Sequence, residues 1–144
     1  MPINGYTVGR DVVLRVIRGD GAVLAIPGLT NFKKKPDMSD HKVVKIDGNV
    51  DHLVFPGGWS GSFELDRTDA SIDNFMAEFE ANYYAGQNVL PGTISESITE
   101  ANGSVSQYKY IGVVLKPTDM GEAAGDKTVK QTLEFMASRR VKGN

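Results

Sequence analysis

The sequence predicts a mainly β protein in which two antiparallel sheets pack as a sandwich or barrel, with one flanking α-helix. Strand-forming Val, Ile, Thr and aromatic residues are spread along the chain together with 16 glycines, a composition typical of strands and turns. Short alternating apolar stretches are separated by turn signals, and a helical period occurs in one stretch. We expect residues 1–144 to form a single domain.

The first half of the chain predicts two hairpins separated by a loop. Residues 11–28 alternate around the turn Gly19-Asp20-Gly21, which indicates a hairpin. Residues 29–40 are charged and interrupted by proline, so we expect a long projecting loop. A second hairpin follows, with Asp47-Gly48 at its turn.

A longer strand is predicted from about Gly58 to Arg67, and it contains the only tryptophan, Trp59. Gly57 and Gly58 follow a proline, which favours a sharp turn into the strand. Gly61 lies on the same face as Trp59 and leaves room for the indole or for a close backbone approach. We therefore interpret Trp59 as a packing anchor.

The period then changes to that of an amphipathic helix. Thr68 or Asp69 is a suitable N-cap, and Gly86 is a suitable C-terminal residue. The apolar face, which we expect to fill the face of one sheet, consists of Ile72, Phe75, Met76, Phe79 and Tyr83.

The last third predicts a third hairpin and a final strand. Asn102-Gly103 is a strong two-residue turn signal between "TISESITE" and "VSQYKYIGVVLK". A Gly-rich loop precedes one long strand, "KTVKQTLEFMASRRV", and residues 142–144 are expected to be a flexible tail.

Composition argues against several classes of function. The chain has no cysteine and a net charge of −2, which disfavours thiolate chemistry and sequence-wide affinity for nucleic acid. No apolar run or N-terminal signal suggests a membrane protein or a secreted one. His41 and His52 lack further ligands, so we expect two exposed strand residues and no metal site. Neither a cofactor nor a catalytic group is predicted.

Rows of small polar residues are the more informative feature. Exposed strands normally carry long charged side chains, whereas two predicted strands carry short hydroxyls with occasional acids, which favours a smooth, hydrated and weakly negative wall. The two rows are Ser60, Ser62, Glu64 and Asp66, and Thr93, Ser95, Ser97 and Thr99.

The one cationic cluster, Lys33-Lys34-Lys35, lies in the predicted loop near Asp37. It is compatible with the solvated tip of a loop, with a protein–protein contact and with a phosphate-binding patch.

The succession of these elements resembles the tail tube proteins of bacteriophages, the family that includes the tubes of contractile tails and the related Hcp proteins. The matching stretches are "VVLRVIRGDGAVLAIP", "GLTNFKKKPDMSD" and "GGWSGSFELDR", the last leading into the helix "DNFMAEFEANYYAG". The likeness spans nearly the whole chain.

The resemblance implies a structural subunit of a virion tail rather than an enzyme. Hexameric rings would join inner strands into one barrel, stack into a tube and conduct DNA through a mildly acidic lumen without specific binding. The lumen candidates are the two rows above. The predicted loop, with Lys33, Lys34, Lys35 and Asp37, would reach the next ring, so replacing the three lysines by Glu is expected to block polymerisation without unfolding.

Further partners implied by the resemblance are sheath, tape-measure and baseplate or terminator proteins, with assembly in the host cytoplasm. An Hcp-like or bacteriocin tube subunit is a close alternative. From a different class, a small-ligand-binding β-barrel would use Trp59 and the tyrosines to line a cavity.

Overall fold

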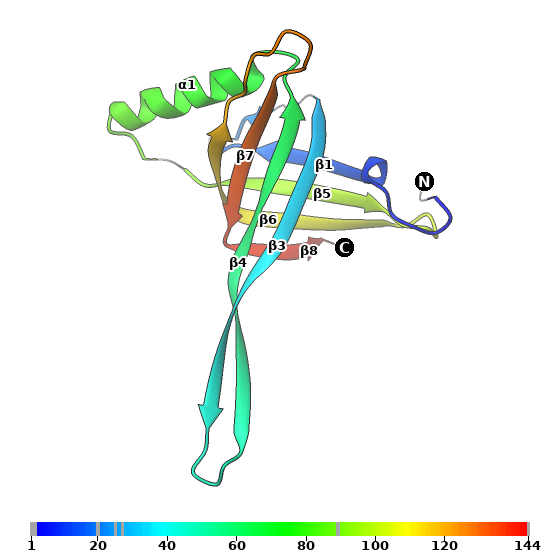
Figure 1. The fold of residues 1–144 in the computed structure, drawn as a ribbon, viewed down its shortest axis with the longest axis vertical. Coiled ribbons are helices and arrows are strands. Elements are labelled where there is room, and N and C mark those ends of the chain that lie inside the picture. Colours follow the sequence, from blue (N-terminus) through cyan, green and yellow to red (C-terminus); the bar gives the residue numbers. More distant parts are fainter. Residues whose placement is uncertain (1–2, 20, 25, 27, 89, 144) are drawn as a thin grey trace.

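The structure of the protein is a computed structural model, which describes residues 3–19, 21–24, 26, 28–88 and 90–143. In these residues the mainly β prediction is confirmed, with eight strands in antiparallel pairing and one α-helix (Figure 1). The elements are η1 (Gly9–Asp11), β1 (Val12–Ile17), β2 (Val23–Leu24), β3 (Leu29–Val44), β4 (Val50–Asp66), α1 (Ser71–Tyr84), β5 (Gly92–Thr99), β6 (Val105–Asp119), β7 (Lys130–Ala137) and β8 (Arg139–Gly143).

The strands form one sheet that is divided by β6 into two halves. Its order is β2-β1-β5-β6-β7-β4-β3, and β8 also pairs with β6. Residues 105–113 of β6 pair with β5, whereas residues 114–119 pair with β7. We call β1, β2, β5, β8 and residues 105–113 the β5 half, and β3, β4, β7 and residues 114–119 the β4 half. Their strands cross in Figure 1, which agrees with the expected two packed sheets.

The chain passes between the two halves at a corner built by Gly112 and Ser138. Gly112 has a φ of 66°, and a Cβ there would press on the Ser138 side chain. The Ser138 amide donates to the Ile111 carbonyl over 2.9 Å. The predicted last strand is therefore two strands, β7 and β8, which lie in different halves.

The expected flexible tail is also wrong for Lys142 and Gly143. Both residues belong to β8, where they are in register with Tyr108 and Gln107 of β6. Asn144, the last residue of the predicted tail, lies outside the described residues.

The core lies between the two halves and beneath the start of α1. Phe63 and Phe135 of the β4 half stack with Phe32, with ring centroids 5.0 and 5.7 Å from that of Phe32. The buried apolar side chains are Val16, Leu24, Phe63, Leu65, Ile72, Ile94, Tyr110, Val113, Leu133, Phe135 and Ala137. Each of the two halves thus has one covered face.

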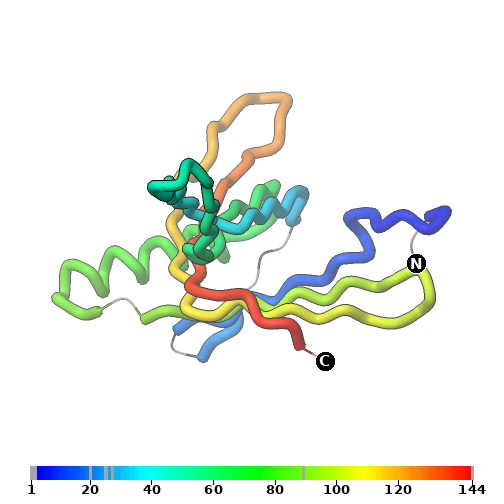
Figure 2. Tube along the Cα trace, turned by 90° about the horizontal axis from the view of Figure 1, so that it is seen from below, coloured from blue at the N-terminus to red at the C-terminus, as the bar shows by residue number. Residues whose placement is uncertain are grey.

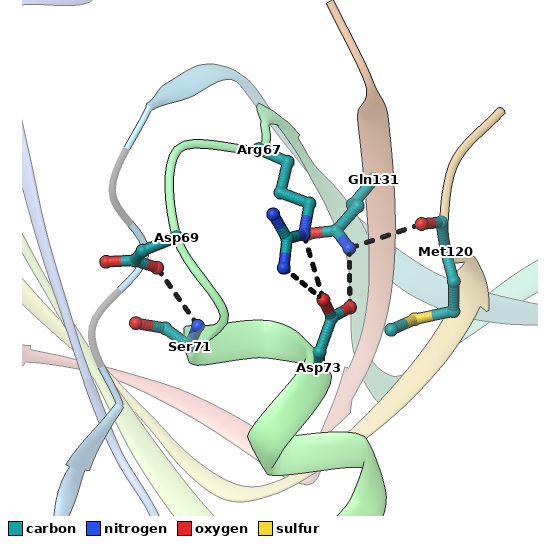
Figure 3. A network of polar contacts seen from close by, with 6 residues as sticks. All are labelled: Arg67, Asp69, Ser71, Asp73, Met120 and Gln131. Carbon is teal, nitrogen blue, oxygen red and sulfur yellow. Dashed lines mark hydrogen bonds and ion pairs between the residues drawn. The ribbon is translucent and has the colours of Figure 1, made fainter. Parts of the chain in front are cut away.

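The predicted helix is confirmed, and Figure 3 shows how its first turn is fixed. Asp69 Oδ1 accepts a hydrogen bond of 3.0 Å from the Ser71 amide. Asp73 forms an ion pair of 2.8 Å with Arg67 and accepts a hydrogen bond of 2.9 Å from Gln131 of β7. These bonds attach the helix start to the β4 half.

The second half of the helix covers less of the sheet than the sequence predicts. Ile72 is buried, and Phe75 and Phe79 are half-buried, but Tyr83 is 63% exposed. The helix leans away from the sheet toward its C-terminal end (Figure 1), so Tyr83 does not fill the sheet face as expected.

Residues 29–40 form most of β3, so the prediction of a loop there was wrong. The hairpin around Asp47-Gly48 is confirmed, with the Lys45 amide donating to the Asn49 carbonyl over 2.9 Å. The strands are longer than expected, because β3 and β4 stay paired from Leu29 and Leu65 to Val44 and Val50.

Beyond Trp59, β4 leaves its other neighbour, β7. Residues 36–58 therefore form a two-stranded ribbon that projects from the body (Figure 1). Gly57 and Gly58 lie within β4, so the predicted sharp turn at these residues is absent. We call residues 36–58 the ribbon.

Candidate assembly and channel surfaces

Four hydroxyl side chains of β5 lie on the face of the β5 half that points away from the core. They alternate with the buried residues Ile94 and Glu96, which point toward the β4 half. The antiparallel register places residues of β1 and β6 on either side of each hydroxyl. We call this surface the hydroxyl face; its described members are Val13, Arg15, Ile17, Val23, Thr93, Ser95, Ser97, Thr99, Val105, Gln107, Lys109, Ile111, Arg139, Val141 and Gly143.

The hydroxyl face is cationic, and the expected weakly negative wall is not what the structure shows there. Arg15 and Lys109 flank Ser95 on its two neighbouring strands. Arg139 lies beside Ile111, which is two residues from Lys109. All three cations are exposed, and the described members of this face include no Asp or Glu.

Glu96 alternates with the hydroxyl residues along β5 and therefore lies on the other face of the strand. There it is buried in a polar cluster between the two halves. Its carboxylate forms ion pairs with Lys34 of β3 and, at 3.6 Å, with Arg140 of β8. The Tyr110 hydroxyl donates a hydrogen bond of 3.1 Å to the same carboxylate. Burial, followed by the charge of Glu96, raises the pKa of the Tyr110 hydroxyl, which keeps it a donor. We call these four residues the Glu96 cluster.

Trp59 packs against this cluster. The Arg140 guanidinium lies 4.8 Å from the indole centroid and 3.6 Å from the centroid of Tyr108, which are distances of cation–π contacts. The indole also meets the Tyr110 ring edge-on at 5.9 Å. These contacts agree with the interpretation of Trp59 as a packing anchor.

Of the two alternatives predicted for Gly61, the close backbone approach is confirmed and the room for the indole is not. A Cβ at Gly61 would press on the Lys33 carbonyl and would lie 2.7 Å from the Phe135 ring. The missing side chain thus serves the close approach of β3 and the packing of Phe135.

The second predicted row, Ser60, Ser62, Glu64 and Asp66, lies on the outward face of the β4 half. Its neighbours across the strands are Lys35 and Lys33 of β3 and Met136 and Glu134 of β7. The structure therefore does not bring the two rows together, because each occupies the outer face of a different half.

The lysine cluster is divided between two environments. Lys33 and Lys35 are exposed on the outward face of the β4 half, and Asp37 accepts a hydrogen bond of 3.1 Å from Ser60. Lys34 points inward to Glu96. Reversing the charge of all three lysines would therefore disturb the fold, contrary to the sequence-based expectation.

The ribbon exposes apolar side chains together with charges. Its strands pair only with each other among the described residues. The large exposed apolar side chains in and around its turn are Met38, Val44, Ile46, Val50, Leu53, Val54 and Phe55. Exposed apolar surface of this extent is typical of a protein–protein contact.

Two edges of the β5 half are open within the described residues. Residues 12–15 of β1 pair with β5 alone, because β2 covers only Val16 and Ile17. At the opposite side, β8 pairs with β6 alone. Figure 2 shows the β5–β6 hairpin between them extending away from the helix. Open edges of this kind are templates for pairing with another chain.

A cleft of about 320 Å³ lies between α1, β1 and β6. Phe75 and Phe79 form its helical side, and Arg18, which forms an ion pair of 2.8 Å with Glu78, lies at its border. Neither Trp59 nor a tyrosine is among its described lining residues, so the feature that would favour a small-ligand barrel is not found there.

The described part of the chain contains neither a cluster of metal-binding side chains nor a membrane-spanning helix. No group of three or more His, Asp or Glu residues there is arranged to hold a metal ion. His41 and His52 are both exposed, as expected, and their register places them on opposite faces of the ribbon. None of the helices among the described residues is long and apolar enough to cross a membrane.

Comparison with solved structures links this arrangement of two sheet halves, helix and ribbon to tube assemblies. A cryo-EM structure of the anti-feeding prophage tube-terminating cap is 14% identical, with a TM-score of 0.66 over 100% of this chain and 95% of that one. The chain has the tail-tube fold. The resemblance predicted from the sequence is thereby confirmed at the level of the fold.

Two further structures of tube assemblies are similar. The sheath–tube complex of an extracellular contractile injection system is 12% identical, with a TM-score of 0.59 over 90% of this chain and 87% of that one. The SPP1 tail tube is 13% identical, with a TM-score of 0.58 over 96% and 79%. No family model and no curated protein matches the chain. These neighbours establish the fold of this chain.

Sequence reasoning noted the positive charge of Arg139 on the last strand, but it missed that three cations meet on the hydroxyl face, and it missed the Glu96 cluster. Arg15, Lys109 and Arg139 come from three separate strands, so only the register brings them together. One signal was present in the sequence. Arg15 and Lys109 alternate along their strands with apolar or aromatic residues that point to the core, which places both cations on the opposite face.

Proposed function

We propose that this protein is the subunit of a phage tail tube, in which six copies form a ring and stacked rings form a channel that conducts DNA. The observation that carries the proposal is the pair of open edges on the β5 half. A similar baseplate structure is described as 6-fold symmetrised, which supports six copies.

The two edges are suited to pair with each other between neighbouring copies. Across the half, β1, β5, β6 and β8 alternate in direction because each neighbouring pair is antiparallel. In a ring, β8 of one copy would therefore meet β1 of the next in antiparallel orientation. A continuous barrel results, and closure leaves no unpaired edge.

The packing of the β5 half against the β4 half supports one assignment of the face that lines the channel. The β4 half packs against one face of the β5 half. Because six copies of the β4 half are too large to fit inside a narrow barrel, they must lie outside it. The hydroxyl face, with Thr93, Ser95, Ser97 and Thr99, then faces the lumen. The row Ser60, Ser62, Glu64 and Asp66 lies on the outer surface, where a sheath protein would make contact.

The ribbon is suited to the contact between successive rings, since it projects beyond the body and exposes apolar side chains. Lys33, Lys35 and Asp37 lie near its base and would contribute to the same contact. Tape-measure, baseplate and terminator proteins would be further partners, and the tube would be assembled in the host cytoplasm and located in the virion tail.

A second candidate is a subunit of an injection-system tube or of its terminating cap. It is favoured by the similarity to the anti-feeding prophage cap, which has the higher TM-score, 0.66, against 0.58 for the SPP1 tube. Negative-stain electron microscopy separates a tube from a cap, because a tube subunit stacks into long tubes by itself whereas a cap subunit stops at single rings.

Edge pairing can be tested by cross-linking, since the chain contains no cysteine. In the double variant Val13→Cys/Val141→Cys, one thiol lies on each open edge. The two positions are separated by β5 and β6, about 14 Å at ordinary strand spacing, which is too far for a disulfide within one copy. Mild oxidation is expected to give a ladder of linked oligomers on a non-reducing gel, ending at the closed ring.

Two controls make this experiment decisive. The variant Ser97→Cys/Gln107→Cys places both thiols on the central strands β5 and β6, where they can link only within one copy. The single variant Val13→Cys has no partner on β8. A ladder from either control would contradict edge pairing. So would the absence of a ladder from Val13→Cys/Val141→Cys and from variants in which the two cysteines are moved along β1 and β8 to sample the neighbouring registers.

A further inference from the structure

We propose that Arg15, Lys109 and Arg139 form a phosphate-contacting row, through which the hydroxyl face holds the backbone of double-stranded DNA. This inference rests on the proposed channel and specifies how its wall meets the cargo. The wall would contact phosphates directly, rather than repel them as an acidic lumen would.

The register defines the geometry of the row. Arg15 of β1 and Lys109 of β6 both lie opposite Ser95 of β5, so their Cα atoms are about 10 Å apart at ordinary strand spacing. Arg139 of β8 is opposite Ile111, one step along the same face from Lys109. The three cations thus cross the full width of the β5 half.

The charges of the row are not neutralised on their own face. No ion pair involving Arg15, Lys109 or Arg139 is found among the described residues, and the described members of the hydroxyl face include no carboxylate. In contrast, Arg140 points to the other side, where the buried Glu96 compensates it. The exposed cations of the row are therefore available to an external anion.

The surrounding side chains favour phosphate over other anionic partners. Arg and Lys together with Ser and Thr hydroxyls are the groups that contact phosphate and sugar in protein–DNA complexes. The face carries no aromatic side chain on which unpaired bases could stack. It also lacks the aromatic anchors that concentrate binding energy in protein–protein interfaces. Double-stranded DNA fits this chemistry best.

The row predicts weak, mobile and salt-dependent contact. Three phosphate contacts by a single copy give a slope of about −2.7 in log K against log salt, so binding by one copy falls ~40-fold for a fourfold rise in salt. The slope is steeper where several copies of a ring contact one duplex. Contacts of this kind position a duplex without reading its sequence and allow it to slide. Such behaviour is compatible with transport.

Three lysines of the β4 half and of the loop before β7 provide a matched control. Lys116, Lys127 and Lys130 are exposed, and Lys116 and Lys130 lie opposite the carboxylates of Glu134 and Asp66. The test variant is Arg15→Gln/Lys109→Gln/Arg139→Gln, and the control variant is Lys116→Gln/Lys127→Gln/Lys130→Gln. Each variant removes three positive charges from exposed positions.

Binding is measured by fluorescence anisotropy with a short labelled DNA duplex across a salt titration. The parent chain and the control variant are expected to bind with the slope given above, and the test variant is expected to lose at least ~10-fold in affinity at low salt. Equal losses in both variants, or no binding by the parent chain, would overturn the proposal. Equally effective competition by polyglutamate would overturn the assignment to DNA.

The oligomeric state of the same samples separates this inference from the proposed function. Rings or tubes of the parent chain without duplex binding refute the phosphate row and leave the tube intact. Duplex binding that depends on the row, in a chain that forms no rings, refutes the tube and leaves the row.

Discussion

Glu96 is the residue on which the contact between the two halves depends most. Its carboxylate is buried and is shared by Lys34, Arg140 and Tyr110. Buried charges are tolerated only when they are paired, so the cluster holds β3, β5, β6 and β8 in one relative arrangement.

The variant Glu96→Ala is expected to destabilise the fold by about 3–5 kcal/mol, because it leaves two cations near the core without a counter-charge. The midpoint of urea unfolding measures this change. Glu134→Ala, on the exposed face of β7, is the control and is expected to stay within about 0.5 kcal/mol of the parent. A parent-like midpoint for Glu96→Ala would show that the cluster does not hold the halves together.

Gly61 is expected to tolerate no side chain. The variant Gly61→Ala places a methyl group against the Lys33 carbonyl and the Phe135 ring, and overpacking of this kind costs about 1–3 kcal/mol. Gly125→Ala is the matched control, since a Cβ there has no neighbour within 4 Å. Thermal unfolding compares the two, and equal melting temperatures would refute the close approach.

At the scale of elements, β3 is the strand that the sequence predicted least well, because residues 29–40 were expected to form a loop. Lys33-Lys34-Lys35 with Pro36 has the composition of a loop, and the apolar residues of the ribbon do not alternate toward a core, since the ribbon has none. Pairing along β3 and β4 is long-range, and no local signal reports it. The turns at Gly48 and Gly103, both with positive φ, were predictable because their chemistry is local.

The double variant Leu53→Ser/Phe55→Ser is expected to leave rings intact and to abolish their stacking. Both side chains lie on one face of the ribbon, and they are 44% and 51% exposed, so their loss removes contact surface without opening a core. Sedimentation velocity and negative-stain microscopy measure the change. Lys42→Ser/His52→Ser, on the other face, is the control, and long tubes from the Leu53/Phe55 variant would rule out this contact.

At the scale of the whole molecule, the fold class, the helix and the strand pairing of all three hairpins followed from the sequence. Asp20, in the predicted turn of the first hairpin, lies outside the described residues. The division of the last strand at Ser138 could not, because no glycine or proline marks it and the corner depends on Gly112 of another strand. The candidate surfaces were predicted in part. The hydroxyl row was recognised from β5 alone, whereas its cations required the register of three neighbouring strands.

The alternation of strand directions in the β5 half has a consequence for the size of the assembly. Each copy would contribute four strands to the barrel, β1, β5, β6 and β8, which is an even number. The last strand of one copy and the first strand of the next are therefore antiparallel for any number of copies. Backbone pairing would thus be satisfied equally by five, six or seven subunits. The ring number would then be set by side chains at the junction, such as Val13 and Val141, and by the curvature that they impose. Substitutions there would change the bore of the channel while the fold of each subunit stays the same.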